Sequence, residues 1–431
     1  MKKQRMFTAV IVLLFVLLLL AEFMPRRDKL VIGIFAGSNW DVPTADGYGR
    51  IEKAIALFKE RYPEVTIEFQ SGIRSDDYEE WLARQLLQDQ MPDVFFVPSQ
   101  LFTTLANNGS LLNLTSLSMQ DSSFDTQNYY ETALKAGMIN DTLYALPYES
   151  VPTLMFVNKT LLNQEGISMP DNDWTWDDFY TICKAVSKDI DGDGKQEQFG
   201  FYDYTWEDAL YSTGISFYDA DHDTANLSST QAVEAVSFLR KLNALNTEKV
   251  TAELFDKGQV AFQPMNYSDY RTYMPYPWRV KKYSNFEWDC LPMPASTNGG
   301  NISQIDTLMV GLSSKSRNQQ LAWEFMKLLS CDEAFQSEVA KESQAVSVLK
   351  SVMTSENVIE ALKEDNPGES NFEMTLLNEV MEQGIVLRKT KQYDQIVQIA
   401  DAQISELMDN DADIENGLAK IQRQIDAYLR R

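Results

Sequence analysis

The chain after residue 28 alternates between short apolar runs and longer stretches with a helical period. The segment 29–35 (KLVIGIF) is almost entirely apolar and predicts a buried strand. Ile51, Ile55 and Phe58 recur at steps of four and three, which places them on one face of a helix. A strand at 65–69, a helix from Tyr78 to about Gln88, and an apolar strand within 92–99 follow. This β-α-β-α-β order favours a largely parallel sheet flanked by helices.

The rest of the chain continues this mixture of strands and helices. The segment 145–159 (ALPYESVPTLMFVNK) is mostly apolar with two prolines, which suits a crossing between domains. Thr175 and Asp178 stand three residues apart before an apolar run, as in a helix-capping box. Strands are expected at 198–204 and 286–294, and helices at 231–245, 321–330 and from 371 to the end. Ile414, Leu418, Ile421, Ile425 and Leu429 form one apolar stripe of the last helix.

The N-terminus combines basic residues with an apolar run. Lys2, Lys3 and Arg5 precede a run from Met6 to Ala21 that is dominated by Val, Leu and Ile, the pattern of an export or anchoring signal. The run lacks the small residues of a good cleavage site, and its basic end is expected in the cytoplasm. We expect an uncleaved transmembrane signal anchor over residues 1–27. The alternative is a cleaved signal peptide and a secreted protein.

Composition and charge exclude some classes of partner. The chain has 431 residues, 44% of them hydrophobic, which is enough for two or three domains with a large core. Its formal net charge of -25 argues against nucleic acid and other polyanions, so a neutral or cationic ligand fits better. The three cysteines are widely spaced and form no CxxC motif, so we interpret them as small buried apolar residues.

The segment 189–200 (DIDGDGKQEQFG) spaces its carboxylates as a calcium-binding loop does. Asp189, Asp191, Asp193 and Glu197 match positions 1, 3, 5 and 9 of an EF-hand loop, with glycine at position 6. Position 12, which is a bidentate glutamate in an EF-hand, is Gly200. The pattern allows a structural calcium ion or a plain acidic loop, and it does not indicate a calcium sensor.

Nine blocks of the chain resemble, in their order, the family 1 extracellular solute-binding proteins of ABC importers, the maltose-binding-protein-like group. The blocks are KLVIGIF, ERYPEVTIEF, PDVFFVPS, LANNGSLLNLT, TLYALPYESVPTLMFVNKTLL, TWDDF, GQVAFQPM, FEWDCLPMP and SSKSRNQQLAWEFMKLLS. In this family a DxDGDG segment often joins a helix to a strand of the second lobe. The chain departs from the family in one respect. It has no cysteine before Cys183, so the lipid anchor of many Gram-positive members is excluded and the transmembrane anchor would replace it.

The resemblance implies an α/β fold of the periplasmic-binding-protein-like type, with two lobes and a ligand cleft between them. The family's chain path gives a first lobe of residues 28–147 plus 296–345. The second lobe would comprise residues 148–295 plus 346–431. The expected location is the extracytoplasmic face of the plasma membrane of a Gram-positive bacterium, and the expected form is a monomer. The expected partners are a carbohydrate ligand and the permease subunits of an ABC transporter. No cofactor is required, although a structural calcium ion is a candidate.

Candidate ligand contacts are loop residues at strand ends, because such loops line the clefts of open α/β sheets. Sugars are bound by aromatic faces and by planar polar groups that satisfy hydroxyls. The strand-end rule indicates Ser38, Asn39, Trp40, Ser99 and Gln100, and the resemblance implies that Tyr148, Glu149, Tyr204 and Trp206 also face the cleft. The candidates are Ser38, Asn39, Trp40, Ser99, Gln100, Tyr148, Glu149, Tyr204, Trp206, Asn266, Tyr267 and Asp306. Each also has a structural alternative: Trp40 as a lid on the first lobe, Tyr148 as a hinge residue, and Asp306 as a turn or cap.

Three functions are compatible with these features. The leading hypothesis is a non-catalytic receptor that captures a mono- or oligosaccharide and delivers it to an ABC permease. The second is a membrane-anchored sugar-binding sensor or adhesin. The third is a secreted glycosidase, which needs only two carboxylates at a fixed separation. Against an enzyme, the sequence shows no nucleophile elbow and no HExxH motif, and its one histidine, His222, lies in a polar run.

Overall fold

The computed structural model describes residues 28–40, 42, 44, 47–220, 222–273, 286–364, 374–390, 392–410 and 412–430. The signal anchor predicted over residues 1–27 lies outside these ranges. Within them, no helix combines the length and the apolar character that crossing a membrane requires.

The first part of the chain forms the predicted β-α-β-α-β unit. Strand β1 pairs in parallel with both β2 and β3, and the apolar faces of helices α2 and α3 are buried. The elements here are β1 (Lys29–Gly33), α2 (Gly49–Arg61), β2 (Thr66–Phe69), α3 (Ser75–Leu87), β3 (Val94–Val97), α4 (Ser99–Asn107), α5 (Thr115–Gln120), a 3-10 turn (Thr126–Asn128), α6 (Glu131–Ala136), β4 (Met138–Ile139) and β5 (Thr142–Leu143). The parallel arrangement predicted from the sequence is confirmed.

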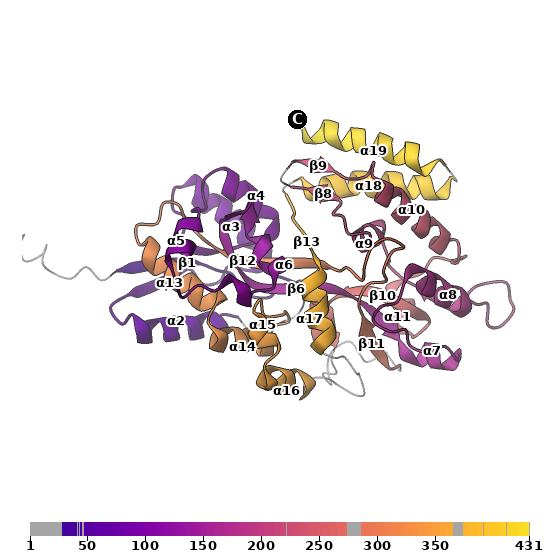
Figure 1. Cartoon of the computed structure of the whole chain (residues 1–431), viewed down its shortest axis with the longest axis horizontal. Coiled ribbons are helices and arrows are strands. Elements are labelled where there is room, and N and C mark those ends of the chain that lie inside the picture. Colours follow the sequence, from indigo (N-terminus) through magenta and orange to yellow (C-terminus); the bar gives the residue numbers. More distant parts are fainter. Residues whose placement is uncertain are drawn as a thin grey trace, which may run out of the picture.

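A single long strand, β6 (Ala145–Asn158), joins the two halves of the molecule. Its first half pairs with β12 (Gln304–Leu312), and its second half pairs with β10 (Val260–Asn266) and β11 (Trp288–Leu291). The resulting order is β2-β1-β3-β12-β6-β10-β7. In Figure 1, β6 and β12 run through the middle, between the two groups of helices. The crossing segment predicted from the two prolines is therefore a continuous strand shared by both halves.

The middle of the chain builds the second half around the end of β6. Its elements are α7 (Lys159–Gln164), α8 (Trp176–Val186), β7 (Phe199–Phe201), α9 (Trp206–Ser212), β8 (Tyr218–Asp219), β9 (Thr224–Ala225), α10 (Thr230–Asn243), α11 (Ala252–Asp256) and α12 (Tyr267–Tyr273). The capping box of Thr175 and Asp178 is confirmed at the start of α8. A second capping box, of Thr205 and Asp208, starts α9.

The C-terminal part returns to the first half and then crosses back. Its elements are α13 (Gln319–Ser330), α14 (Glu333–Glu342), α15 (Lys350–Met353), α16 (Glu356–Glu364), α17 (Met374–Gln383), β13 (Ile385–Val386), α18 (Tyr393–Asp409) and α19 (Ile414–Leu429). Strand β13 pairs in parallel with β12. The predicted stripe of α19 is buried at Leu418, Ile421, Ile425 and Leu429, which confirms its role in the core.

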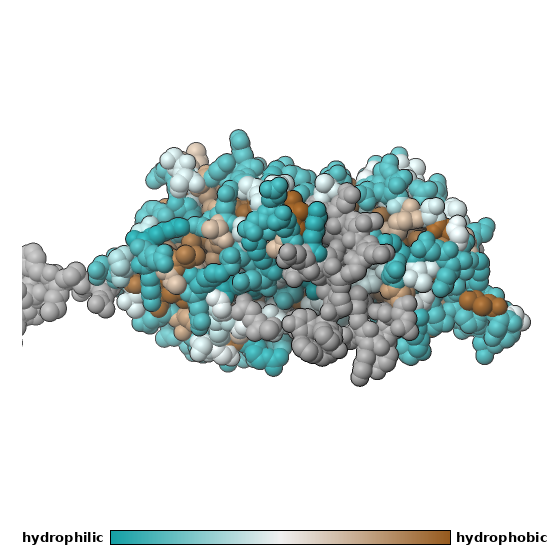
Figure 2. Space-filling model, turned by 90° about the horizontal axis from the view of Figure 1, so that it is seen from below, coloured by the Kyte–Doolittle hydropathy of each residue, from teal (hydrophilic) through white to brown (hydrophobic). Residues whose placement is uncertain are grey.

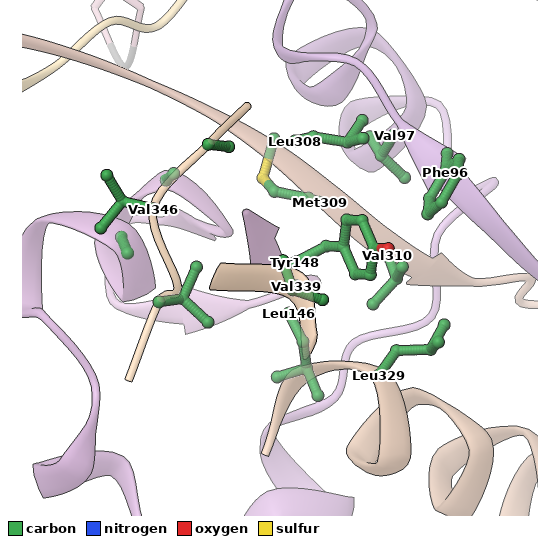
Figure 3. Close-up of a cluster of buried hydrophobic side chains, with 14 of the residues drawn as sticks. Phe96, Val97, Leu146, Tyr148, Leu308, Met309, Val310, Leu329, Val339 and Val346 are labelled. Carbon is green, nitrogen blue, oxygen red and sulfur yellow. The ribbon is translucent and has the colours of Figure 1, made fainter. Parts of the chain in front are cut away.

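The buried apolar side chains form two clusters, and the first of them reaches into both halves, since it also contains Val260 and Trp288. The first includes Leu30 and Phe95 and extends along β6 as far as Phe156. The second includes Met155, next to Phe156 but on the opposite face of β6. Figure 3 shows part of the first cluster, in which Tyr148 lies among side chains of β3, β12 and the helices beside them. We call the β2-β1-β3 end the first lobe and the β10-β7 end the second lobe.

The chain path between the lobes bears on the predicted domain boundaries. Side chains from Val346 to Met381 belong to the first cluster, whereas those from Tyr393 to Leu429 belong to the second. The boundaries at 147, 295 and 345 stay a prediction.

Large exposed apolar side chains among the described residues are dispersed, at Leu87, Met119 and Ile190. Figure 2 agrees, because the described atoms on the face seen from below are mostly hydrophilic.

Candidate ligand-binding cleft

The first lobe contributes a polar hollow at the carboxyl ends of its strands. Ser38 and Asn39 follow β1, and Gln100 follows β3 at the start of α4. Together with Asp306 of β12 they line a cavity of about 480 Å³. The remaining lining is dominated by charged side chains, namely Asp76, Glu79 and Glu80 of α3 and Lys389 after β13. The structure therefore brings together four of the residues predicted from the sequence.

The second lobe contributes a polar hollow of about 600 Å³. Asp203 and Thr205 follow β7, and Asn266 ends β10, so this cavity too lies where strands end. The lining also includes Asp208 of α9 and Asp269 of α12. Of the residues predicted from the sequence in this lobe, Asn266 lines the cavity.

Strand β12 contributes one lining residue to each of the two hollows. Gln304 lines the second-lobe cavity and Asp306 lines the first-lobe cavity. Residues two apart on a strand point to the same face, so both side chains face the space between the lobes. Gln304 Nε2 donates to Asp208 Oδ1 at 3.3 Å, and Lys389 Nζ lies 3.5 Å from Asp306 Oδ2. The floor of the cleft is thus a strand that both lobes share.

Trp40 lies over the crossing strand. Its Nε1 donates to Glu149 Oε1 at 2.9 Å, and its backbone N donates to Ser38 Oγ at 3.1 Å. Glu149 is 3% exposed and belongs to β6, so the hydrogen bond ties the loop after β1 to the strand that joins the lobes. Trp40 is partly buried in the first core cluster, which leaves part of its indole exposed.

Ser99 and Gln100 begin helix α4. Ser99 Oγ donates to Gln100 Oε1 at 3.4 Å, and Gln100 Nε2 donates to Glu79. Gln100 lines the first-lobe cavity, and Ser99 lies beside it without being part of the lining. This placement fixes the amide of Gln100 toward the acidic side chains of α3.

Four of the predicted aromatic residues lie in the interior of the lobes. Tyr148, Tyr204, Trp206 and Tyr267 are each at most 4% exposed, and none of them lines either hollow. Their partners are internal. The Tyr148 ring lies 5.1 Å from that of Phe96. Trp176 Nε1 donates to Tyr204 Oη at 3.0 Å, Trp206 Nε1 donates to Asp401 Oδ1 at 2.6 Å, and the Tyr267 ring stacks on Tyr270. These aromatic side chains pack behind the walls of the cleft.

Sequence reasoning missed several polar residues of the walls. They are Asp76, Glu79, Glu80, Thr153, Asp203, Thr205, Asp208, Gln263, Asp269, Gln304 and Lys389. Two signals could have found some of them. Asp203 follows an apolar strand directly, and Thr205 with Asp208 forms a second capping pattern like that of Thr175 with Asp178. Gln304 alternates with Asp306, which was chosen, so the period of the strand implied it.

The acidic loop between α8 and β7 holds four carboxylates close together. One oxygen each of Asp189, Asp191, Asp193 and Glu197 lies within 4.8 Å of the others. Backbone N–H groups already bind all four residues: Gly192 and Gly194 donate to Asp189, and Ile190 donates to Glu197. The backbone N of Asp193 donates to Asp191, and that of Lys195 donates to Asp193. Gly200, at position 12 of the calcium-loop pattern, lies in β7 against Cys183 of α8. This packing excludes the bidentate glutamate of an EF-hand.

Comparisons with known proteins agree with the fold. Residues 42–334 match the family model described as bacterial extracellular solute-binding protein. The galactooligosaccharide-binding protein of Bacillus subtilis (strain 168) is 23% identical over 286 residues, which cover 61% of each chain. The chain thus aligns with about 61% of the length of this curated relative.

Two solved structures share the fold over nearly their whole length. The cyclic alpha-maltosyl-1,6-maltose binding protein from Arthrobacter globiformis superposes with a TM-score of 0.76 at 16% identity, covering 94% of this chain and 99% of that one. The sugar-binding protein MalE from Xanthomonas citri gives a TM-score of 0.73 at 15% identity, covering 93% and 97%. The predicted two-lobed α/β fold is confirmed. Since the family model matches more than half of its length, the chain belongs to the bacterial extracellular solute-binding protein family.

Proposed function

We propose that the protein captures a carbohydrate between its two lobes and delivers it to an ABC permease outside the cytoplasm. The observation that carries this proposal is the pair of polar hollows, one in each lobe, whose linings include Gln304 and Asp306, two residues apart on β12. A solute that contacts both walls would hold the lobes together and stabilise a closed form.

The chemistry of the two walls supports a polyhydroxylated solute. Amide groups of Asn39, Gln100 and Asn266 and carboxylates such as Asp306 donate or accept the paired hydrogen bonds that neighbouring sugar hydroxyls make. Trp40, partly exposed beside the first-lobe hollow, offers an apolar face for a pyranose ring. The names of the similar proteins, which bind galactooligosaccharide or cyclic maltosyl-maltose, support the same class of ligand.

The binding-protein family favours the receptor over the two alternatives weighed from the sequence. Its description is that of solute-binding proteins, so a glycosidase is not proposed. A sensor or adhesin would use the same cleft. It would differ from a transport receptor only in the partner protein that binds the closed form. Loss of uptake of the bound sugar after deletion of the gene supports the transport role, whereas unchanged uptake contradicts it.

A carbohydrate that fits the cleft is expected to raise the thermal stability of the full chain, kept in mild detergent. At 100 times its dissociation constant, a ligand that binds only the folded state adds about 2.7 kcal/mol to the free energy of unfolding. The measurement is the unfolding midpoint against a panel of mono- and oligosaccharides, with chromatography of the sugar afterwards. A raised midpoint with intact sugar supports a receptor. Turnover of the sugar would contradict it, and so would the absence of any response.

We propose that residues 1–27 hold the protein, as a monomer, at the extracytoplasmic face of the membrane. This rests on the basic residues and the apolar run of that segment. The expected result is that the full chain stays in the membrane fraction after an alkaline wash and that mass spectrometry finds its first residues. A chain that begins after residue 21 in the medium would show cleavage and secretion instead.

We propose that calcium, if it binds, stabilises the acidic loop and takes no part in solute capture. Three of the four residues are exposed, the loop precedes β7 whereas Asp203 and Thr205 follow it, and the loop lacks the bidentate ligand. Calcium is expected to raise the unfolding midpoint of the wild-type chain and not that of an Asp191→Asn/Asp193→Asn variant. Equal responses of the two proteins would contradict a site in this loop.

A further inference from the structure

The described lining of the second-lobe hollow is negatively charged. Asp256 and the three carboxylates of Asp203, Asp208 and Asp269 line it, and no Lys or Arg is among its described lining residues. None of the three carboxylates forms an ion pair with a described residue, in contrast to Asp306 across the cleft, which lies next to Lys389. Their hydrogen bonds come from neutral groups.

The three carboxylates differ in exposure: Asp208 is buried, Asp269 is half-buried and Asp203 is exposed. Asp208 is 7% exposed, and its Oδ2 accepts hydrogen bonds from the backbone N and the hydroxyl of Thr205. Asp269 Oδ2 accepts from the backbone N of Asn266 at 3.2 Å. Burial raises the pKa of Asp208 to about 6, and it raises the pKa of Asp203 and of Asp269 above the ordinary value. A cation bound among the three carboxylates would offset the free-energy cost of keeping them charged where access to water is reduced.

The opposite wall adds to this charge. Asp76, Glu79 and Glu80 line the first-lobe hollow, and Asp76 and Glu80 pair with Arg74 and Arg84, whereas Glu79 accepts from the neutral Gln100. Bringing two acidic walls together around a neutral solute costs Coulomb and desolvation energy. A positive charge on the solute would remove that cost at the moment of closure.

The geometry favours an organic cation over a metal ion. Among the described acidic residues, only the loop group of Asp189 to Glu197 brings at least three ligand atoms to within 4.8 Å of one another. Asp203, Asp208 and Asp269 do not converge in that way but surround a cavity of about 600 Å³. Thr153, Gln263 and Asn266 line the same cavity and offer hydroxyl and amide groups to a polar organic molecule.

We infer that the solute is a carbohydrate with a protonated amine, such as an amino sugar or its oligomer, whose ammonium group lies among Asp203, Asp208 and Asp269. This inference rests on the proposed function, since it concerns the same cleft. The hydroxyls of the sugar would be bound by Thr153, Gln263 and Asn266. The amine would supply the specificity for this solute over neutral sugars of the same size, because a neutral group leaves the three carboxylates without a counter-charge.

The test compares two oligosaccharides that differ at the amine, which is free and protonated in one and acetylated and neutral in the other. Glucosamine oligomers carry one ammonium group on each ring, and N-acetylglucosamine oligomers of the same length carry none. Calorimetric titration of the full chain in detergent is expected to show at least tenfold tighter binding of the charged oligomer, weakening as salt rises. Asp203→Asn and Asp269→Asn are each expected to reduce this preference several-fold, because binding of the charged oligomer should weaken more than binding of the neutral one. Asp177→Asn, an exposed residue of the same lobe outside the cavity, is the matched control.

Each outcome decides between the inference and the function on which it rests. Tighter binding of a neutral sugar than of any amino sugar overturns the inference and leaves the proposed function standing. Binding of spermidine, which has amines and no hydroxyls, with no binding of any sugar overturns the carbohydrate assignment in both proposals. No binding of any probe overturns both. Equal losses for charged and neutral oligomers in the aspartate variants also overturn the inference, because they would report a structural role.

Discussion

Replacing Asp121 by alanine is expected to lower the free energy of unfolding by about 3 kcal/mol. Asp121 follows α5 and joins it to α13 of the first lobe. Its Oδ2 lies 2.5 Å from Lys327 Nζ and accepts from Trp323 Nε1 at 2.9 Å. The side chains of both ionic partners are less than a fifth exposed, at 17% and 14%. The alanine variant would leave the indole N–H of Trp323 without its acceptor, and Lys327 would lose one of its two carboxylate partners and keep Glu324 at 3.1 Å. Denaturant unfolding followed by tryptophan fluorescence measures the loss.

The same contact gives a pH dependence with a definite sign. Burial opposes ionisation of Asp121, but hydrogen bonds from Lys327, Ser123 and Trp323 outweigh it and hold its pKa well below the ordinary value. A lowered pKa in the folded state stabilises the protein above the ordinary pKa of about 4, and this contribution is lost as the pH falls further. The stability difference between wild type and Asp121→Asn should therefore be large at pH 7 and shrink toward pH 3.

An exposed ion pair of the same lobe provides the control for Asp121. Lys29 Nζ lies 2.6 Å from Glu68 Oε2, but the two side chains are 52% and 54% exposed. Glu68→Gln is expected to change the stability by less than about 1 kcal/mol, because exposed pairs are well solvated. Equal losses for Glu68→Gln and Asp121→Asn would contradict the importance assigned to the contact between α5 and α13.

Gly200→Ala is expected to destabilise the second lobe by about 3 kcal/mol, at the upper end of the usual cost of overpacking. Gly200 is the middle residue of β7, and a Cβ there would lie 2.6 Å from Cys183 Cα and 2.4 Å from Cys183 Cβ of α8. A backbone atom is part of this clash, so no change of rotamer relieves it. Because β7 leads directly to Asp203 and Thr205, the variant should also weaken solute binding.

Gly300→Ala is the control for this substitution. A Cβ at Gly300 would have its nearest described neighbour, a side-chain atom of Ile302, at 3.5 Å, which is an ordinary contact. Its unfolding midpoint is expected to stay close to that of the wild type. A wild-type midpoint for Gly200→Ala would show that α8 and β7 can separate more easily than their packing indicates.

Many of the helices and strands were predictable from the local pattern of apolar and polar residues. The periods of 29–97 predicted three strands and two helices, and Thr175 with Asp178 predicted the start of α8. The pairing of β6 was beyond such reasoning. Apolar runs do not reveal that one strand of 14 residues pairs with β12 along its first half and with β10 and β11 along its second. Those contacts join segments more than a hundred residues apart.

The lining residues that lie at strand ends were predictable from the sequence. Whether an aromatic side chain is buried or lines the cleft was less predictable. Ser38, Asn39, Gln100 and Asn266 line the hollows as their positions at strand ends suggested, and Asp306, also predicted, lines the first hollow from within β12. The aromatic residues Tyr204, Trp206 and Tyr267 were chosen because their type suits sugars, yet the structure packs them inside the second lobe. A side chain's type does not tell which face of its element is covered, and this depends on distant segments such as α18, which supplies Asp401 to Trp206.

Calorimetric titration of two asparagine variants tests most directly whether both lobes hold one solute. The titrant is the sugar that most stabilises the wild type. Asn39→Ala removes an amide from the first-lobe hollow, and Asn266→Ala removes one from the second. We expect each variant to bind at least about tenfold more weakly, a loss of about 1.4 kcal/mol. The exposed Asn172→Ala should match the wild type. Wild-type affinity in both cleft variants, or a loss confined to one lobe, would contradict capture between the lobes.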